Sequence, residues 1–310
     1  MQCLVVALVG PTATGKSAAA LALAHALRAE GRTAEVVNAD SMQLYRGMDI
    51  GTAKLSPAER ADVPHHLLDI WPVTRPASVA DYQLRARDAI DDVHRRGGVA
   101  LLVGGSGLYV RAAVDRLEFP GTDAQLRADL EAELAAHGAL ALHRRLAAVD
   151  PAAAAAILPT NGRRIVRALE VVQLTGRPFT AALPAYESVY DVVHVGLDRP
   201  AEDLDTRVAR RVDAMFAAGL VDEVRALEAE GLRAGPTASR ALGYQQILAA
   251  LAGTMTLDEA QAETVRSTRR FVRRQRSWFG RDPRVRWWDG DDVGGVVEVV
   301  RRAVGERRES

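Results

Sequence analysis

Apolar stretches and helical stretches alternate along the chain as far as Phe119. Residues 3–9 (CLVVALV) are continuously apolar and partly β-branched, as in a strand buried within a parallel sheet. Residues 17–31 are rich in alanine and leucine and predict a helix that ends near Gly31. A second strand is predicted over 33–40, and a further buried strand in 98–107 ends in a glycine-rich turn. This alternation predicts an α/β fold with a doubly wound parallel sheet, in which ligands gather at the C-terminal edge of the strands.

The segment after the second strand has no hydrophobic periodicity. Residues 47–70 are interrupted by glycine and proline, and loops of this length in compact domains are usually functional or disordered. A helical pattern begins at Ser78, which can cap the helix, with Asp81 at the third helical position. The apolar stripe of this helix comprises Val79, Tyr82, Ala86, Ile90 and Val93.

Beyond Phe119 the alternation stops. Residues 122–176 predict consecutive helices: one from Asp123, one over 139–149, one started by Asp150 and Pro151, and one from Asn161 to Gly176. A strand over 190–197 then returns to the sheet, and helices fill most of the remaining chain. We therefore expect a core domain of residues 1–118 and 190–310 and an all-helical insertion of residues 119–189.

The glycine-rich stretch after the first strand has a chemical pattern. Residues 10–17 (GPTATGKS) fit the phosphate loop G-x-x-x-x-G-K-[ST] at every fixed position, between a strand and a helix. Backbone N–H groups at such a helix start bind an anion, Lys16 adds a point charge, and the Ser17 hydroxyl can bind Mg²⁺. Only two of the 40 basic residues are lysine, Lys16 and Lys54, which suggests that position 16 needs a compact ammonium group. The fold is therefore expected to be P-loop NTPase-like.

Composition restricts the class of protein. The chain has 310 residues, 48% hydrophobic and 26% charged, as in a globular protein of one large or two smaller domains. No apolar stretch approaches the roughly 18 residues of a membrane span, and the first apolar run is too short for a signal peptide. The single Cys3 excludes an internal disulfide, so we expect a cytoplasmic protein. The histidines show no metal-ligand spacing, although His65 and His66 could bind a metal instead of serving in loop packing.

One acidic residue is a candidate for catalysis, and one acidic residue that P-loop ATPases usually have is missing. Asp40, at the end of the second predicted strand, would lie near the phosphate loop and could act on a nucleophile; the alternative is a helix-capping aspartate. A P-loop ATPase usually has a further strand that ends in an aspartate, but here that strand ends in Gly104 and Gly105. This absence disfavours a motor ATPase and leaves small kinases and diphosphate-handling transferases.

Arginines occupy three helices in distinctive positions. In the helix over 201–219, Arg211 lies about 20° from Leu204 at the edge of the apolar face, with Arg207 beside it. Such an arginine either pairs with an internal acid or clamps a diphosphate. Arg163, Arg164 and Arg167 lie on the last helix of the insertion and could equally be solvated. Net charge is zero, but residues 266–286 contain nine arginines and only one acid, which favours a polyanionic partner.

Seven strings occur in the order GPTATGKS, NADSMQLYRGMDIGTAK, PHHLLDI, LLVGGSGLY, RRIVRALEV, RALGYQQ and RRQRSWF. Together they resemble the tRNA dimethylallyltransferases, also called tRNA isopentenyltransferases, over nearly the whole chain. The resemblance implies that the phosphate loop holds the diphosphate of dimethylallyl diphosphate with Mg²⁺ on Ser17. It also implies that the prenyl group passes to N6 of the adenosine at tRNA position 37, next to the anticodon, and we expect a monomer.

The resemblance also implies roles for individual residues. Asp40 would take the proton from the adenine amine or orient it, and Arg211 would complete the clamp on the diphosphate. Implied diphosphate-binding residues are Gly10, Pro11, Thr12, Ala13, Thr14, Gly15, Lys16, Ser17 and Arg164. Implied tRNA-binding residues are Asp40, Ser41, Met42, Gln43, Ser106, Arg127, Arg163, Arg164, Ile165, Val166, Arg167, Arg240, Gly243, Tyr244, Arg273, Arg274 and Gln275. Such an enzyme must extrude the base into a pocket and place cations where the leaving diphosphate develops charge.

Four positions depart from the family pattern, and rival functions stay open. Ser17 and Ser106 stand where threonine is usual and keep the hydroxyl; Gln245 and Gly280 stand where basic residues are common, so these two tRNA contacts are open. A small-molecule kinase would also use a phosphate loop and a carboxylate, but it would not explain the arginine-rich helix. Two further rivals are a nucleic-acid-stimulated ATPase and a transferase that acts on free adenine nucleotides.

Overall fold

The computed structural model describes residues 4–60, 62–179 and 185–306. The chain divides into two compact units, one of Met1–Asp115 with Ser188–Ser310 and one of Arg116–Glu187. The boundaries expected from the sequence, after residues 118 and 189, lie a few residues further along the chain. Each unit has its own hydrophobic core.

Within the described residues, the strands of the first unit form one parallel sheet in the order β3-β2-β4-β1-β5-β6. These strands are β1 (Leu4–Val9), β2 (Ala34–Asn38), β3 (His65–His66), β4 (Val99–Gly104), β5 (Asp191–Asp198) and β6 (Arg286–Asp289). All residues of β1 and β4 are buried, as expected where helices cover both faces of a parallel sheet. The expected strand at Cys3 begins at Leu4 in the described chain, because residue 3 lies outside it.

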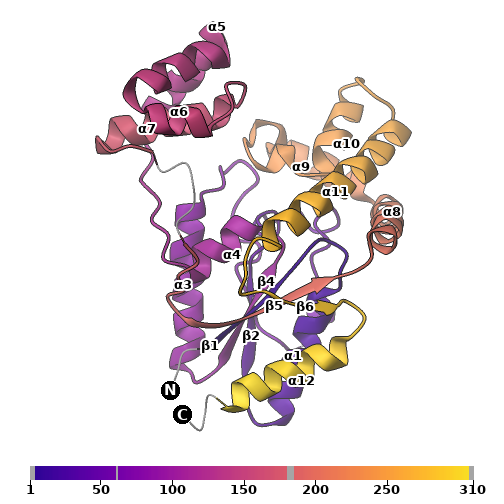
Figure 1. Cartoon of the computed structure of the whole chain (residues 1–310). Helices are drawn as coiled ribbons and strands as arrows, with labels where there is room; N and C mark the ends of the chain where they lie inside the picture. Colours follow the sequence, from indigo (N-terminus) through magenta and orange to yellow (C-terminus); the bar gives the residue numbers. More distant parts are fainter. Residues whose placement is uncertain (1–3, 61, 180–184, 307–310) are drawn as a thin grey trace. The chain divides into compact units, whose positions relative to one another are not determined.

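Helices cover both faces of the sheet (Figure 1). The first unit contains α1 (Lys16–Ala29), α2 (Pro57–Arg60), α3 (Val79–Arg95), α4 (Gly107–Val114), α8 (Ala201–Ala217), α9 (Leu220–Ala229), α10 (Tyr244–Leu251), α11 (Leu257–Phe279) and α12 (Val293–Glu306), with short 3₁₀ turns at Leu232–Ala234 and Ala238–Arg240. Side chains of α1 and α12 pack on one face of β1, around Val6 and Leu8. The predicted cap of α3 is confirmed: the Ser78 hydroxyl accepts a hydrogen bond from the Asp81 N–H.

Two strands were missed because their side chains lack the expected pattern. β6 is a short edge strand whose residues are mostly exposed, so no apolar run marks it in the sequence. β3 consists only of His65 and His66, inside the segment that showed no periodicity. Both histidines make hydrogen-bond contacts, the alternative to metal binding: His65 Nδ1 lies 2.8 Å from the Val63 carbonyl oxygen, and His66 Nε2 lies 2.6 Å from Glu35 Oε2.

The second unit is helical, as expected. Its described helices are α5 (Ala124–Val149), α6 (Pro151–Ala156) and α7 (Gly162–Thr175). The two helices predicted on either side of Gly138 are confirmed: α5 is interrupted at Gly138, whose φ of 76° and ψ of 164° are not helical. Asp150 caps α6, Asn161 caps α7, and Gly176 ends α7 in the left-handed conformation, all where the sequence predicted. No helix in the described parts of the chain is long and apolar enough to cross a membrane.

Candidate active site

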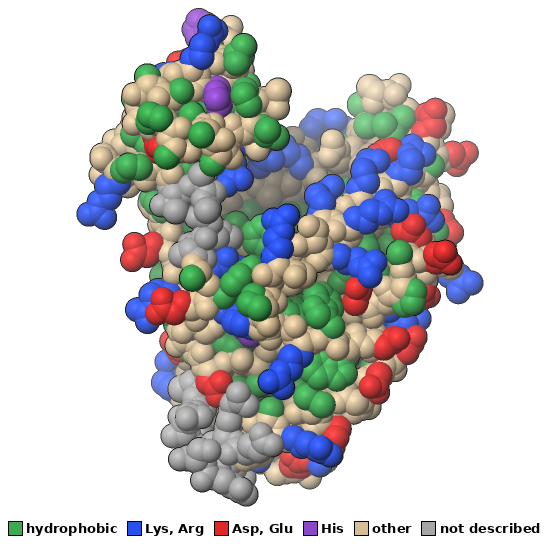
Figure 2. Space-filling model, viewed as in Figure 1, with side chains coloured by type: hydrophobic (Ala, Val, Ile, Leu, Met, Phe, Trp, Pro, Cys, Tyr) green, Lys and Arg blue, Asp and Glu red, His purple; other side chains and the backbone are tan. Residues whose placement is uncertain are grey.

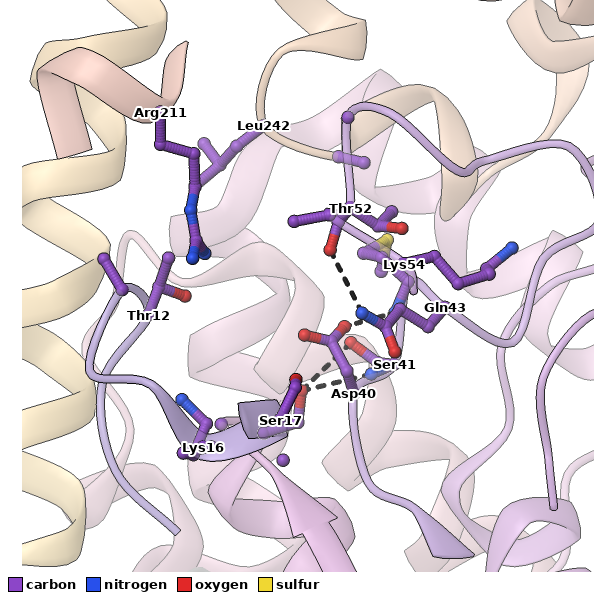
Figure 3. A pocket seen from close by; sticks show the side chains of 18 of the residues that line it. Thr12, Lys16, Ser17, Asp40, Ser41, Gln43, Thr52, Lys54, Arg211 and Leu242 are labelled. Atoms are coloured by element: carbon purple, nitrogen blue, oxygen red, sulfur yellow. Dashed lines mark hydrogen bonds between the residues drawn. The ribbon is translucent and has the colours of Figure 1, made fainter. Parts of the chain in front are cut away.

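A cavity of about 730 Å³ opens at the C-terminal edge of β1, β2 and β4, within the first unit. The phosphate loop, the turn after β2, the β4–α4 turn and α8 supply its walls, together with residues 51–55, 240–244 and part of α11. Figure 3 shows that Lys16, Ser17, Asp40 and Arg211 lie around the same space, although they come from three separate elements. The fold therefore brings the main predicted catalytic residues of this unit into one site.

The phosphate loop has the geometry of an anion site. Gly10 has a φ of 135°, and a Cβ there would lie 2.2 Å from the Leu197 carbonyl oxygen, so only glycine fits. Gly15 precedes α1 in the left-handed conformation, and as a glycine it has no side chain that could cap the helix start. The first N–H groups of α1 are therefore available to an anion at the positive end of the helix dipole. The loop also contains Ala13 with a φ of 72°, a conformation that costs a non-glycine residue free energy.

Lys16 is held inside this loop. Its Nζ donates a hydrogen bond of 2.5 Å to the Pro11 carbonyl oxygen. Burial, together with the nearby Arg211 guanidinium, lowers the pKa of Lys16 to about 7, although Asp40 opposes the shift. The lysine is thus a cation that an incoming anion would stabilise.

Arg211 reaches the cavity from α8. Among the described residues, its side chain makes no hydrogen bond or ion pair, and Figure 3 shows it pointing into the cavity. Burial lowers the pKa of Arg211, with a smaller effect of Arg207. Arg207, one turn earlier, instead donates to Asp203 at 2.9 Å. The internal salt bridge left open by the sequence therefore belongs to Arg207, and Arg211 is left for a ligand.

Asp40 faces these cations from the turn after β2. Its Oδ1 accepts a hydrogen bond of 2.9 Å from the Met42 N–H, and its own N–H donates to Asn38 Oδ1. The carboxylate therefore closes a local turn and caps no helix, which excludes the capping alternative. Burial raises the pKa of Asp40, although the Met42 N–H and Lys16 oppose this. A carboxylate with a raised pKa is a better proton acceptor than an exposed one.

Polar residues around Asp40 are fixed by hydrogen bonds. The Ser106 hydroxyl accepts from the Ser41 N–H at 3.2 Å and lies 3.3 Å from the Ser41 hydroxyl. The Gln43 side-chain amide donates to the Thr52 carbonyl oxygen at 3.1 Å (Figure 3). Ser41, Met42, Gln43 and Ser106 all line the cavity, as their predicted role in holding a base requires.

Two residues to which the sequence analysis assigned no role, Glu223 and Lys54, hold the cavity wall formed by residues 49–54. The Glu223 carboxylate accepts hydrogen bonds from the N–H groups of Asp49, Ile50 and Gly51 and from the Tyr244 hydroxyl. Lys54 is buried, and its Nζ donates to Asp49 and Asp69. Lys54 had a sequence signal as the second of only two lysines, whereas nothing near Glu223 in the sequence indicated its role.

The α11 helix carries its arginines on an exposed face. Arg273 and Arg274 are exposed, Arg240 is exposed near the start of α10, and basic side chains gather along the face that α11 occupies (Figure 2). Acids moderate this charge more than the sequence suggested: Arg270 pairs with Glu263 and Arg273 with Asp205. Arg274 lines the cavity and lies over the Phe271 ring.

Several predicted tRNA contacts prove to be interior residues of the first unit. The Tyr244 side chain is fully buried against Gly51 and Glu223, so it forms the cavity wall. Gly243 is also buried, whereas Gln245 and Gly280 are exposed. Gln275 is only 5% exposed, and its amide is bound to backbone groups inside the unit, so its predicted contact with tRNA is wrong for the side chain.

The second unit requires a similar correction. Ile165 and Val166 are buried in its hydrophobic core and cannot present side chains to a tRNA. Arg127 and Arg167 both bind the fully buried Glu170 carboxylate, at 2.6 and 2.7 Å. Although burial opposes it, hydrogen bonds from Arg127, Thr122 and Arg167 lower the pKa of Glu170 to about 2. Arg163 and Arg164 are exposed and remain candidates for a nucleic-acid contact.

The sheet and the site define a P-loop-type α/β protein. Its phosphate loop faces the Asp40 carboxylate, and β4 ends at Gly104 instead of at an acidic residue. The model of the family described as IPP transferase matches residues 43–282. The chain is 66% identical over 93% of its length to a tRNA dimethylallyltransferase of Thermobifida fusca, covering 91% of that protein, and 67% identical over 97% to one of Streptomyces coelicolor, covering 94%. It also resembles the crystal structure of a tRNA isopentenylpyrophosphate transferase from Bacillus halodurans, with a TM-score of 0.73, 39% identity and 99% coverage of both chains. The chain therefore belongs to the IPP transferase family.

Proposed function

We propose that this protein transfers the dimethylallyl group of dimethylallyl diphosphate to N6 of adenosine 37 in tRNA, giving N6-(dimethylallyl)adenosine and diphosphate. The observation that carries the proposal is the placement of two cations and a carboxylate around one cavity: Lys16 and Arg211 face Asp40. The names of the relatives, which match nearly the whole chain, support this activity over a small-molecule kinase.

Each part of the site has a role in this displacement. The adenine N6 forms a bond to C1 of the prenyl group, the C1–O bond breaks, and its electron pair leaves with the diphosphate. Asp40 takes the proton that N6 loses, which its raised pKa favours. The free N–H groups of α1, Lys16 and Arg211 stabilise the charge that develops on the diphosphate.

Magnesium fits this site through oxygen ligands. The Ser17 hydroxyl lines the cavity at the start of α1, and the described residues contain no cluster of carboxylates or histidines that would form a complete metal cage. Mg²⁺ usually binds through one or two protein oxygens and the phosphates of the substrate. Ser17 would hold the ion together with diphosphate oxygens, and the ion would neutralise charge on the leaving group.

The tRNA is proposed to lie along the exposed arginines of α11, with Arg163 and Arg164 of the second unit as further contacts. These side chains present positive charge on exposed helix faces, as phosphate recognition requires. We also propose that the protein acts as a monomer in the cytoplasm, as the sequence analysis expects.

A labelling experiment separates the proposed function from its rivals. The protein is mixed with unmodified tRNA, or with free AMP, and with dimethylallyl diphosphate labelled in the prenyl group or ATP labelled in the γ-phosphate. Label should enter tRNA from the prenyl donor alone, and digestion should place it at adenosine 37. Transfer of phosphate from ATP would establish a kinase, and prenylation of AMP but not tRNA would establish the free-nucleotide alternative.

A further inference from the structure

The α11 helix contains a buried glutamine between its exposed arginines. Arg273, Arg274 and Arg276 are exposed or partly exposed, whereas Gln275 is 5% exposed and lies on the seam with Val272 and Phe279. A glutamine amide has both donors and an acceptor, and burying it costs free energy unless these groups are paired. The hydrogen-bond partners of the Gln275 amide therefore show which segments this buried side chain connects.

The Gln275 amide joins two segments of the cavity wall. Its Oε1 accepts a hydrogen bond of 3.0 Å from the Thr12 N–H in the phosphate loop. Its Nε2 donates one of 2.8 Å to the Gly105 carbonyl oxygen in the β4–α4 turn. These segments are far apart in the sequence from α11, and the Gln275 side chain joins them just beyond the ends of the paired strands β1 and β4.

The glycine-rich turn is shaped to let α11 approach. A Cβ on Gly105 would lie 2.3 Å from Gln275 Nε2, and a Cβ on Gly107 would lie 2.0 Å from Trp278 Nε1. Both distances are too short for any side chain, so the two glycines leave room for Gln275 and Trp278. The close contact between α11 and the turn therefore depends on the two glycines of the turn as well as on the two side chains of α11.

We propose that Gln275 is a positioning residue for the prenyl-diphosphate site, an inference that rests on the proposed function. The bond to the Thr12 N–H fixes the residue before Ala13, whose φ of 72° is strained and needs support from its surroundings. The bond to Gly105 fixes the residue before Ser106, whose hydroxyl holds Ser41 beside Asp40. One amide thus aligns the diphosphate side of the cavity with the acceptor side.

This role predicts two separable functions on one helix. The exposed arginines of α11 act on tRNA, whereas Gln275, between them in the sequence, acts on the prenyl donor. Replacing Gln275 with methionine keeps the volume of the side chain but removes both hydrogen bonds. We expect the dissociation constant and KM for dimethylallyl diphosphate to rise roughly 5- to 100-fold, the scale set by a broken buried hydrogen-bond pair. The affinity for tRNA should change less than about twofold.

Two controls separate positioning from general damage. Gln83→Met removes a buried glutamine that binds the Ala112 carbonyl oxygen away from the cavity, so it should lower the melting temperature and leave the donor KM unchanged. Arg273→Gln removes an exposed charge two residues from Gln275 and should weaken tRNA binding without changing the dissociation constant of the donor.

A second variant tests the contact from its other side. Gly105→Ala places a methyl group against Gln275 Nε2 and should raise the donor KM as Gln275→Met does, even if the methionine variant does not fold. Donor binding is measured by isothermal titration calorimetry with dimethylallyl diphosphate and Mg²⁺, and turnover with unmodified tRNA.

The outcomes distinguish this inference from the proposed function. If the wild type neither binds the prenyl donor nor transfers it, the proposed function fails. If the wild type does both, but Gln275→Met and Gly105→Ala bind the donor as tightly as the wild type, the positioning role is overturned. An equal rise in donor KM for Gln83→Met would also overturn it, because any buried glutamine would then have the same effect.

Discussion

Arg211 gives the sharpest test of the site, because its side chain pairs with no described residue and yet is partly buried. If diphosphate is its partner, the empty enzyme carries an underpaired guanidinium. Replacing it with glutamine should then leave the stability of the empty protein unchanged or slightly higher. The same change should weaken the interaction with diphosphate by about 2 kcal/mol, within the range of hydrogen bonds to charged groups.

The size of the effect follows from ligand linkage. At a diphosphate concentration of about 100 times the wild-type Kd, binding stabilises the folded protein by about 2.7 kcal/mol. A loss of about 2 kcal/mol raises Kd roughly 30-fold, so the same concentration is only about three times the Kd of the variant. The stabilisation then falls to about 0.9 kcal/mol. For a unit of this size, the melting shift should fall from roughly 5–11 °C to roughly 2–4 °C.

The assay is thermal melting with and without inorganic diphosphate and Mg²⁺, with turnover measured on the same samples. Arg225→Gln is the matched control, since Arg225 is an exposed arginine on the neighbouring helix, pairs with Asp222 and does not line the cavity. It should keep the full diphosphate shift. An Arg211→Gln protein that melts well below the wild type when empty, yet keeps the full shift, would refute the reasoning and make Arg211 an internal structural cation.

Three further perturbations test other parts of the molecule. Asp40→Ala should bind tRNA nearly normally and turn over roughly 10²–10⁴-fold more slowly. In the wild type, Asp40 must be deprotonated to act as a base, and burial raises its pKa. The wild-type rate should therefore begin to fall, as the pH is lowered, at a higher pH than for an ordinary carboxyl group. Neutralising Arg270, Arg273 and Arg274 together should weaken tRNA binding and flatten its salt dependence by up to about 0.7–0.9 log unit for each phosphate that is no longer neutralised. Neutralising only Arg270 and Arg273, which do not line the cavity, should leave the donor KM unchanged. Glu170→Gln should destabilise the second unit by about 1–3 kcal/mol at neutral pH, and most of this difference should vanish between about pH 4.5 and pH 2.

Each of these has a clear contrary result. An Asp40→Ala enzyme with wild-type turnover would remove the carboxylate from catalysis. An unchanged salt slope would mean that the arginines of α11 face only solvent. For Glu170, the folded pKa lies below its ordinary value, so its contribution is present above that value and is lost as pH falls toward about 2. Glu133→Gln, at a partly exposed ion pair in the same unit, is the control and should have little effect; an equal loss there would contradict the assignment.

The sequence by itself determined the features whose physics is local. The phosphate loop, the caps of α3, α6 and α7 and the buried strands β1 and β4 follow from neighbouring residues, since glycine conformation, capping hydroxyls and apolar runs act within a few positions of the chain. The family resemblance predicted that the same loop holds the diphosphate. Local patterns therefore sufficed for the α/β class of the first unit and for the helical second unit.

Only the tertiary structure decided which polar groups are free and which are already paired. By sequence, Arg211 could pair with an internal acid or face a ligand, and only the fold places its side chain in the cavity while Arg207 binds Asp203. Gln275 belongs to an arginine-rich string, yet its partners lie more than 160 residues away in the chain. Burial and hydrogen-bond partners depend on such distant contacts, which leave no periodic signal in the sequence. For the same reason, the burial that shifts the pKa values of Lys16 and Asp40, and the pairing of Arg207, could be assigned only from the folded chain.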